Sequence, residues 1–216
     1  MMNMNIATVV IIAANVLFSL KGFKDFEFFE KYKFNIAGLR RGEQVRMISS
    51  GFLHADFSHL LFNMLTLYFF ADVVIGFLSV FKFVIIYLTS LIVGNLLSYS
   101  FHKNEYHYSA IGASGAVTGV LFAAILYYPD MPLYMFFIPI PIPAWIFGIA
   151  YLLFSIYGMK KSLGNIGHDA HFGGAIAGYV LTLIFAPYIM DTQLWIVILL
   201  ATPIILLFVL MKMGKI

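Results

Sequence analysis

The chain has 216 residues, of which 62% are hydrophobic and only 11% are charged, and its mean hydropathy is +0.94. A soluble domain carries about a quarter charged residues, so lipid must solvate much of this apolar surface, which predicts a polytopic membrane protein. The formal net charge of +3 is too small to indicate a nucleic-acid partner. The absence of cysteine excludes disulfides, a thiolate nucleophile and cysteine-based metal sites.

Apolar runs divide the chain into seven predicted helices, at about 4–20, 57–78, 80–100, 113–128, 142–158, 168–188 and 193–212. Each approaches the roughly 20 residues needed to cross a bilayer, where backbone groups must satisfy one another within a helix. We therefore expect an all-α polytopic membrane helix bundle, with residues 1–216 forming one domain. The first run is expected to be a retained helix, with a cleaved signal peptide as the alternative, because it has neither a basic n-region nor a small-residue cleavage site.

Two connecting segments differ from ordinary loops. Residues 21–55 mix seven basic, four acidic and several aromatic side chains. This composition fits either an amphipathic segment at the membrane interface or a solvated charged loop. In residues 137–143 alternate prolines forbid a regular helix. We expect that stretch to lie in the interface and to leave the fifth helix loosely attached at one end.

Polar side chains interrupt three of the apolar runs. His59 and Asn63 lie four residues apart on one face of the second helix, and His54 lies just before it. Ser114 opens the fourth run and His171 lies in the sixth. Ionisable groups within a membrane are costly and usually face a cavity, so these residues predict a functional site.

The spacing of the helices predicts that these side chains meet. The second, fourth and sixth runs begin on the same side of the membrane, so His59, Ser114 and His171 lie at a similar depth. Small residues on the fourth and sixth helices predict a close contact between them; they are Gly112, Gly115, Gly174 and Gly178. Ser114 and His171 can then come within hydrogen-bond reach, the arrangement that a base-activated serine requires.

The same residues predict the rest of an acyl-transfer site in a small wet cavity. Asp169 lies two residues before His171 and so on another face, which favours a dyad rather than a triad. An oxyanion needs hydrogen-bond donors. The N–H groups at the helix start formed by Ser114, the His59 ring and the Asn63 amide could supply them.

Other interpretations of these residues remain open. The small residues around Ser114 could serve only to pack two helices closely together, with no catalytic role. Four histidines, His54, His59, His168 and His171, could bind a metal, although no acidic ligand pattern accompanies them. A proton relay or transport site would use the same residue types, but the chain has no evident internal repeat. We expect neither a metal nor a cofactor.

Taken in order, these motifs resemble the rhomboid intramembrane serine proteases over nearly the full length of the chain. The matching positions are Glu43 and Arg46; His54, His59 and Asn63; Gly112 to Gly115 around Ser114; and His171 followed by Gly174 and Gly178. The resemblance implies a six-helix core at about 4–188 and an extra C-terminal helix at about 193–212.

The resemblance also implies roles for individual residues. Ser114 would be the nucleophile and His171 the general base and acid, while His59 and Asn63 would stabilise the oxyanion. Glu43 and Arg46 would support the fold, with His54 and the four glycines. The partners would be transmembrane segments of other proteins and the lipid bilayer, not nucleic acid. The alternative is a non-proteolytic binder of membrane helices, like inactive relatives that typically lack the serine or the histidine.

Three features depart from the family pattern. Many members carry an aromatic residue one turn after the serine, where this chain has Thr118, so we expect His171 to be held less firmly or by another aromatic. Val45 stands where a tryptophan usually precedes the arginine. Twelve of the thirteen Lys and Arg residues lie on the side of the site, which the positive-inside rule places in the cytoplasm. The family places the site outside. We expect the family orientation, in a bacterial plasma membrane.

Overall fold

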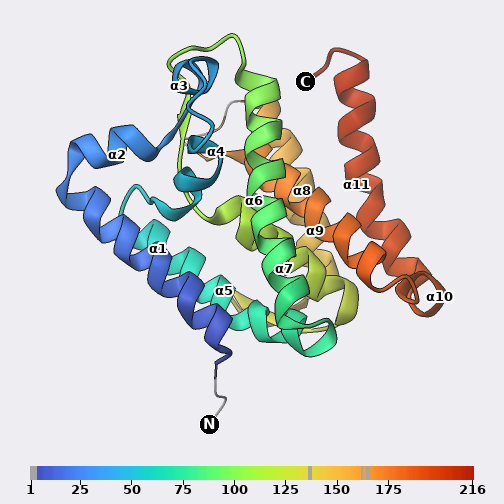
Figure 1. Cartoon of the computed structure of the whole chain (residues 1–216). Coiled ribbons are helices and arrows are strands. Elements are labelled where there is room, and N and C mark those ends of the chain that lie inside the picture. Colours follow the sequence, from blue (N-terminus) through green and yellow to red (C-terminus); the bar gives the residue numbers. More distant parts are fainter. Residues whose placement is uncertain (1–3, 136–137, 162, 164–165) are drawn as a thin grey trace.

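Seven helices of the computed structural model correspond to the seven apolar runs, and the structure describes residues 4–135, 138–161, 163 and 166–216. They are α1 (Ile6–Lys24), α5 (Phe57–Phe77), α6 (Val80–His102), α7 (Ser114–Tyr127), α8 (Ala144–Lys161), α9 (His168–Phe185) and α11 (Leu194–Lys212). They form one bundle, with the two ends of the chain at opposite ends of it (Figure 1). This confirms the predicted polytopic membrane bundle. Three predicted ends differ by three or four residues, because α1 ends four residues later and α8 three residues later than predicted, and α9 ends three residues earlier.

The helices differ in whether their length and apolar composition suffice for a membrane span. By length and composition, α1, α5, α6 and α11 are each long and apolar enough to span it. The 14-residue helix α7 is shorter, and all its residues from Gly115 to Tyr127 are buried. Since α7 is surrounded by protein rather than by lipid, small residues and a short length suffice there.

Glycines bring α7 and α9 into direct backbone contact. A Cβ on Gly174 would lie 2.0 Å from the carbonyl oxygen of Gly115, and one on Gly178 would lie 2.1 Å from that of Gly119. Only glycine fits at such separations, because close approach of two helices requires the smallest residues. The predicted contact is present, and it also includes Gly119, which the sequence analysis did not select.

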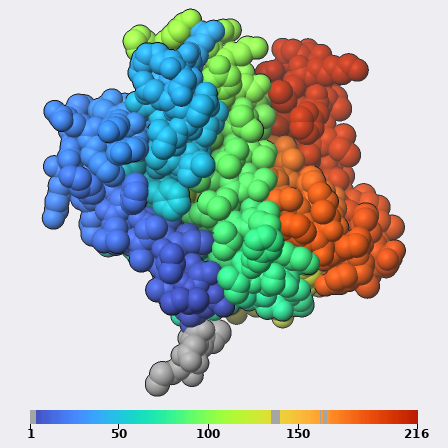
Figure 2. All heavy atoms as spheres, viewed as in Figure 1, coloured from blue at the N-terminus to red at the C-terminus, as the bar shows by residue number. Residues whose placement is uncertain are grey.

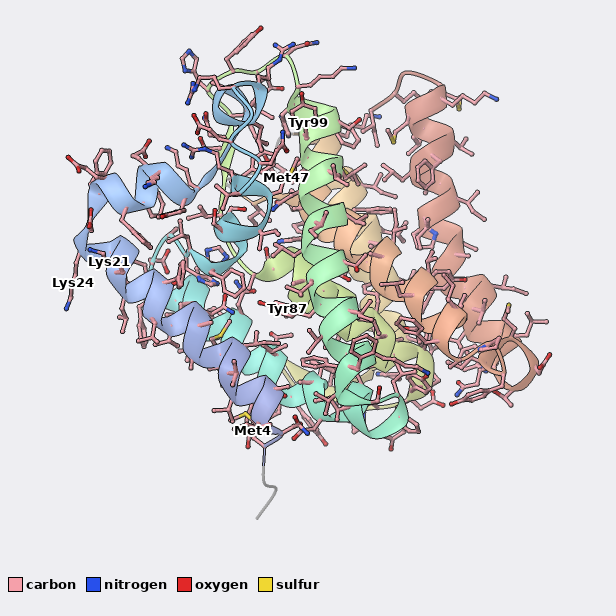
Figure 3. All side chains as sticks on the ribbon, viewed as in Figure 1. Met4, Lys21, Lys24, Met47, Tyr87 and Tyr99 are labelled. Carbon is pink, nitrogen blue, oxygen red and sulfur yellow. The ribbon has the colours of Figure 1, made fainter. Side chains whose placement is uncertain are left out.

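The first connecting segment is folded rather than free. It contains α2 (Phe26–Tyr32), α3 (Ile36–Arg40), α4 (Arg46–Ser49) and the 3₁₀ helix η1 (Ser50–Phe52), and β1 (Phe34–Asn35) pairs antiparallel with β2 (Ser109–Ala110). These elements lie together at the end of the bundle that holds the C-terminus (Figure 1). Lys21 and Lys24 mark the end of α1 where this segment begins (Figure 3).

Arg46 holds this segment together. Its buried guanidinium donates from Nε to Glu43 Oε2 at 2.6 Å, and from Nη1 to the carbonyl oxygens of Glu30 and Lys33, each at 2.8 Å. The same guanidinium lowers the pKa of the Glu43 carboxyl from its ordinary value. The carbonyl groups that Arg46 satisfies lie 16 and 13 residues away, so one side chain closes much of the loop.

Buried polar contacts fasten the other helices around α6. Asn15 of α1 donates from Nδ2 to the Tyr87 hydroxyl of α6 at 3.1 Å. Asn95, also on α6, donates to the carbonyl oxygen of Met47 in α4 at 2.8 Å. Figure 3 labels Tyr87 on α6 and Met47 in the neighbouring α4. Because hydrocarbon offers no hydrogen bonds, each such pair favours one arrangement of helices.

The proline-rich stretch forms part of a hairpin, which adds β structure to the predicted all-α fold. Strand β3 (Pro132–Met135) pairs antiparallel with β4 (Ile138–Pro143), and the predicted start of the stretch at Phe137 lies outside the described residues. The stretch is non-helical, as predicted. Ala144 N donates to Met131 O and Trp145 N to Pro129 O, each at 3.0 Å. These hydrogen bonds join the start of α8 to the hairpin, and the loose attachment of this helix end to the bundle stays a prediction.

The seventh long helix packs against α8. The rings of Trp145 in α8 and Trp195 in α11 meet edge to face at 5.9 Å. A Cβ on Gly148 would lie 3.4 Å from Leu200 Cδ2, so α11 also lies close to the next turn of α8. The short helix α10 (Ile189–Thr192) connects α9 to α11. Figure 2 shows the N-terminal third of the chain along one flank of the molecule and α11 along the opposite flank.

Candidate active site

Ser114 and His171 form a direct hydrogen-bonded pair. His171 Nε2 lies 2.7 Å from Ser114 Oγ, although the residues are 57 positions apart. Ser114 is the first residue of α7 and His171 lies in the first turn of α9. The backbone contact between Gly115 and Gly174, one residue beyond Ser114 and three beyond His171, brings these helix starts together. Both residues are only partly buried.

Tyr151 of α8 contacts the other nitrogen of the same imidazole. Its hydroxyl lies 2.8 Å from His171 Nδ1, and the two rings stack with centroids 5.9 Å apart and planes 23° apart. Thr118 Oγ1 lies 3.4 Å from the Tyr151 hydroxyl. Thr118 thus leaves the aromatic position on α7 empty, and an aromatic from α8 occupies the space. The sequence analysis expected His171 to be held less firmly or by another aromatic, and it did not identify Tyr151.

His59 lies beside the backbone that precedes Ser114. A Cβ on Gly112 would lie 2.7 Å from Cε1 and 2.8 Å from Nε2 of the His59 ring, and 3.7 Å from Ser114 Oγ. Gly112 also has a φ of +119°, a conformation open mainly to glycine. The predicted role of Gly112 in the contact between α7 and α9 was wrong, because Gly112 precedes α7 and makes room for His59.

Asn63 supplies an unpaired donor one turn further along α5. It is buried, and its Nδ2 has no hydrogen-bond partner among the described residues. Leaving a buried polar group unpaired costs about 1–3 kcal/mol. A ligand that accepts a hydrogen bond from this amide would remove that cost.

His54 connects α1 to the turn before Ser114. Ser19 Oγ donates to Phe52 O at 3.0 Å, so His54 Nδ1, 2.8 Å away, donates to Ser19. His54 Nε2 then accepts from Ala113 N at 3.4 Å. The ring also meets His59 edge to face at 4.9 Å. His54 therefore fixes the approach to α7 and the orientation of His59 without touching Ser114 in these contacts.

The neighbouring acidic residue points away from the pair. Asp169 is buried, and its Oδ2 lies 3.3 Å from His102 Nε2 on α6. His102 in turn stacks on Tyr108 with centroids 3.6 Å apart. This agrees with the prediction that Asp169 would lie on another face of its helix than His171.

The alternative metal site has little support in the geometry. Among the residues that the structure describes, no group of three or more His, Cys, Asp or Glu side chains is placed to hold a metal ion. His168 packs edge to face on Phe154, and a Cβ on Gly158 would lie 2.4 Å from its ring. Its ring centroid is 6.4 Å from that of His171.

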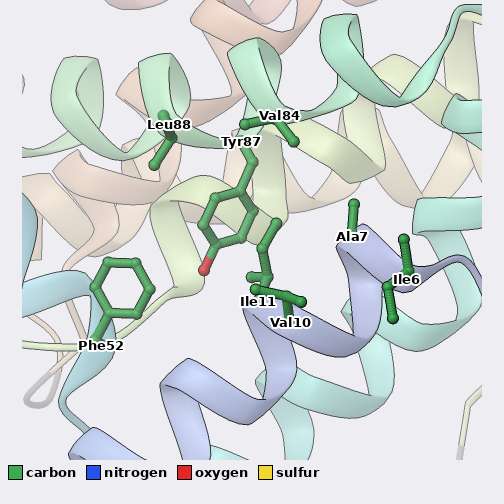
Figure 4. A pocket seen from close by; sticks show the side chains of 8 residues that line it. All are labelled: Ile6, Ala7, Val10, Ile11, Phe52, Val84, Tyr87 and Leu88. Atoms are coloured by element: carbon green, nitrogen blue, oxygen red, sulfur yellow. The ribbon is translucent and has the colours of Figure 1, made fainter.

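A pocket of about 290 Å³ lies elsewhere, between α1 and α6. Figure 4 shows it lined by the apolar side chains of these helices, with Phe52 at one end and Tyr87 in the middle. Its lining includes none of the candidate site residues. The chemistry available at the Ser114–His171 pair is therefore separate from this pocket.

Comparisons with known proteins agree with this geometry. The family model for the rhomboid domain matches residues 41–188, which include every candidate site residue. Rhomboid protein 1, mitochondrial, of Saccharomyces cerevisiae is 31% identical over 138 residues, which cover 62% of this chain and 40% of the yeast protein. The putative rhomboid protease YdcA of Bacillus subtilis is 38% identical over 90 residues, covering 42% of this chain and 44% of that protein.

A second Bacillus subtilis relative, rhomboid protease GluP, is 30% identical over 141 residues, covering 65% of this chain and 26% of its own length. The matched regions span about half or less of these relatives. The family model nevertheless covers more than half of the present sequence, including the helices that hold Ser114 and His171. The chain belongs to the rhomboid family.

Proposed function

We propose that this multi-pass membrane protein is an intramembrane serine endopeptidase that cleaves transmembrane segments of other proteins with Ser114 and His171. Membership of the rhomboid family, with relatives named as proteases, supports a protease-type function. The observation that carries the proposal is the 2.7 Å contact between His171 Nε2 and Ser114 Oγ. A nucleophile and a base in direct hydrogen-bond contact are the signature of an activated serine.

The reaction follows from this contact. His171 Nε2 takes the Ser114 proton as Oγ bonds to the scissile carbonyl carbon, and later gives that proton to the leaving amine. The C–N bond breaks and leaves an acyl-enzyme on Ser114. A water molecule then attacks the ester with His171 again as base, which releases the new carboxyl end and restores the serine.

Three groups are the candidate hydrogen-bond donors to the oxyanion. The N–H groups in the first turn of α7 have no intrahelical acceptor and lie at the positive end of the helix dipole. The unpaired Asn63 amide and the His59 ring lie on α5, on the same side of the bundle as Ser114. Donors held in place before the reaction stabilise the developing charge without reorganisation.

The finer assignments belong to the same proposal. The whole chain, 1–216, acts as one domain, with a core of six long helices and α11 as an addition. Glu43, Arg46 and His54 support the fold rather than the chemistry, in keeping with their contacts to the first segment and to α1. Substrates are membrane helices whose ends unwind, because a protease needs an extended backbone at its serine.

The experiment that tests this function uses a fluorophosphonate, which labels activated serines, and a reconstituted transmembrane substrate. We expect labelling and cleavage by the wild-type chain, and neither by Ser114→Ala, although that variant inserts and folds. His171→Ala should behave in the same way. Asn63→Ala should lose about a hundredfold in cleavage, the effect of removing one oxyanion donor.

Three results would overturn the proposal. Normal cleavage by Ser114→Ala would exclude the serine mechanism. Tight binding of membrane helices by an unlabelled, inactive wild type would favour the non-proteolytic binder. Loss of cleavage on adding a chelator would favour the metal site, whereas a serine mechanism predicts no change.

The orientation is also part of the proposal. We place the active-site end outside a bacterial plasma membrane, against the excess of basic residues at that end. The first segment is a folded unit in which Arg46 binds Glu43 and backbone carbonyls. Its basic residues therefore need not keep this segment on the cytoplasmic side of the membrane. A reporter fused after Ile216 should report a non-cytoplasmic end. A cytoplasmic reporter would reverse the orientation.

A further inference from the structure

We propose that Tyr151 is a positioning residue for His171, and that through it the orientation of His171 depends on the position of α8. The proposal rests on the function proposed above and identifies what holds its general base. Tyr151 lies on α8, whereas Ser114 and His171 lie on α7 and α9. The dyad is therefore assembled from three helices rather than two.

The hydrogen bonds around His171 are compatible with the tautomer that catalysis needs. For Nε2 of a neutral His171 to accept the Ser114 proton, the ring hydrogen must sit on Nδ1. That N–H can donate to the Tyr151 hydroxyl oxygen at 2.8 Å. The Tyr151 hydroxyl hydrogen can then turn toward Thr118 Oγ1, at 3.4 Å. Thr118, Tyr151, His171 and Ser114 thus form one chain of hydrogen bonds that ends at the nucleophile.

Tyr151 also restrains the ring itself. Its ring stacks on the imidazole and on Phe147, at centroid distances of 5.9 and 5.8 Å. Asp169, the nearest carboxylate along the chain, is engaged with His102 instead. Tyr151 is the side chain that hydrogen-bonds His171 Nδ1 within the part of the chain that the structure describes. It takes the place that a carboxylate holds in a catalytic triad.

The position on α8 has a mechanical consequence. α7 and α9 touch through glycine backbones, so the contact between these two helices sets the Ser114–His171 distance. The Tyr151 hydrogen bond does depend on it, because a shift of α8 by about 1 Å would lengthen a 2.8 Å contact beyond hydrogen-bond range. If α8 were displaced, Ser114 and His171 would stay in contact, but the His171 imidazole would no longer be held in one orientation by Tyr151.

The test compares Tyr151→Phe with the wild type and with Tyr157→Phe, a control on an exposed part of the same helix. Tyr151→Phe keeps the ring but removes the hydroxyl. We expect kcat for a reconstituted transmembrane substrate to fall about three- to tenfold with KM unchanged, the effect of losing one hydrogen bond of ordinary strength. Tyr157→Phe should leave both constants unchanged.

A second measurement reports the tautomer without relying on activity. In ¹⁵N spectra of histidine-labelled protein, with the His171 signals assigned from a His171→Gln sample, the wild type should show Nδ1 protonated. Tyr151→Phe should show a mixture of tautomers. A merely structural role for Tyr151 would not change this signal.

The outcomes separate this inference from the proposed protease function. Wild-type kcat and an unchanged ¹⁵N signal in Tyr151→Phe would overturn the positioning role, even if Ser114→Ala is inactive. An inactive wild type whose His171 tautomer still depends on Tyr151 would overturn the protease and leave the positioning role standing.

In the double variant Tyr151→Ala/Thr118→Tyr, a ring supplied from α7 should restore kcat relative to Tyr151→Ala. Failure of this rescue with normal folding would show that the site on α8 itself is required.

Discussion

The contact between α7 and α9 and the contacts of α8 hold the candidate site by different means. Between α7 and α9, Gly115 and Gly119 meet Gly174 and Gly178, and an added Cβ would lie 2.0–2.1 Å from a carbonyl oxygen. Around Gly148 of α8, the atoms nearest an added Cβ are tips of side chains, at 3.0–3.6 Å. One contact is backbone against backbone, whereas at Gly148 the backbone of α8 meets side-chain tips from α7 and α11.

This difference divides the site into a fixed part and an adjustable part. Backbones cannot change rotamer, so the Ser114–His171 pair moves only if whole helices move. Side chains such as Ile125 and Leu200 around Gly148 can shift by a few tenths of an ångström at low cost. Tyr151 belongs to the adjustable part and His171 to the fixed part, so the hydrogen bond between them joins the two.

The largest effect is expected from Gly174→Ala, which disrupts the backbone contact of the fixed part. Its methyl group would lie 2.0 Å from the carbonyl oxygen of Gly115, so α7 and α9 must separate by more than 1 Å. A displacement of about 1 Å in an active site costs about a hundredfold in rate. We expect at least that loss in cleavage of a transmembrane substrate, with a lower unfolding temperature in detergent.

A matched control isolates the clash from the substitution itself. Gly76 in α5 has no heavy atom within 4 Å of an added Cβ, so Gly76→Ala should leave activity unchanged and slightly raise stability, since alanine favours helix by about 1 kcal/mol. Full activity in Gly174→Ala would show that the backbone contact does not set the dyad.

The smallest effect is expected from Gly148→Ala, which touches the adjustable part. Its methyl group would meet Ile125 Cδ1 at 3.0 Å and Leu200 Cδ2 at 3.4 Å, both at the ends of flexible side chains. The gain in helix propensity, about 1 kcal/mol, offsets much of this crowding. We expect cleavage within about twofold of the wild type, since 0.4 kcal/mol corresponds to a factor of two.

The measurement is the same cleavage assay as for Gly174→Ala, so the two alanine substitutions can be compared directly. A loss as large as that of Gly174→Ala would remove the distinction between fixed and adjustable parts. A clear gain in kcat would instead indicate that α8 is poorly seated in the wild type.

The amino-acid sequence by itself determined the membrane bundle and its helices, and it predicted the candidate site on α7 and α9. Lipid imposes long apolar runs, so the helices could be located to within a few residues. Polar residues are costly in those runs, so His59, Asn63, Ser114 and His171 could be recognised from the sequence without any structure. Alternation of the helices across the membrane placed three of these residues at one depth, and glycine spacing predicted the contact that joins Ser114 to His171.

Only the tertiary structure identified Tyr151, the role of Gly112 and the hairpin before α8. A tyrosine in a membrane helix is unremarkable in sequence, and its partner depends on the rotation of α8 against α9, which apolar periodicity does not specify. Gly112 resembles the neighbouring small residues until its φ of +119° and the His59 ring beside it are known. Local sequence dictates where a helix lies and what it must bury, whereas contacts between segments far apart in the chain decide which side chains meet.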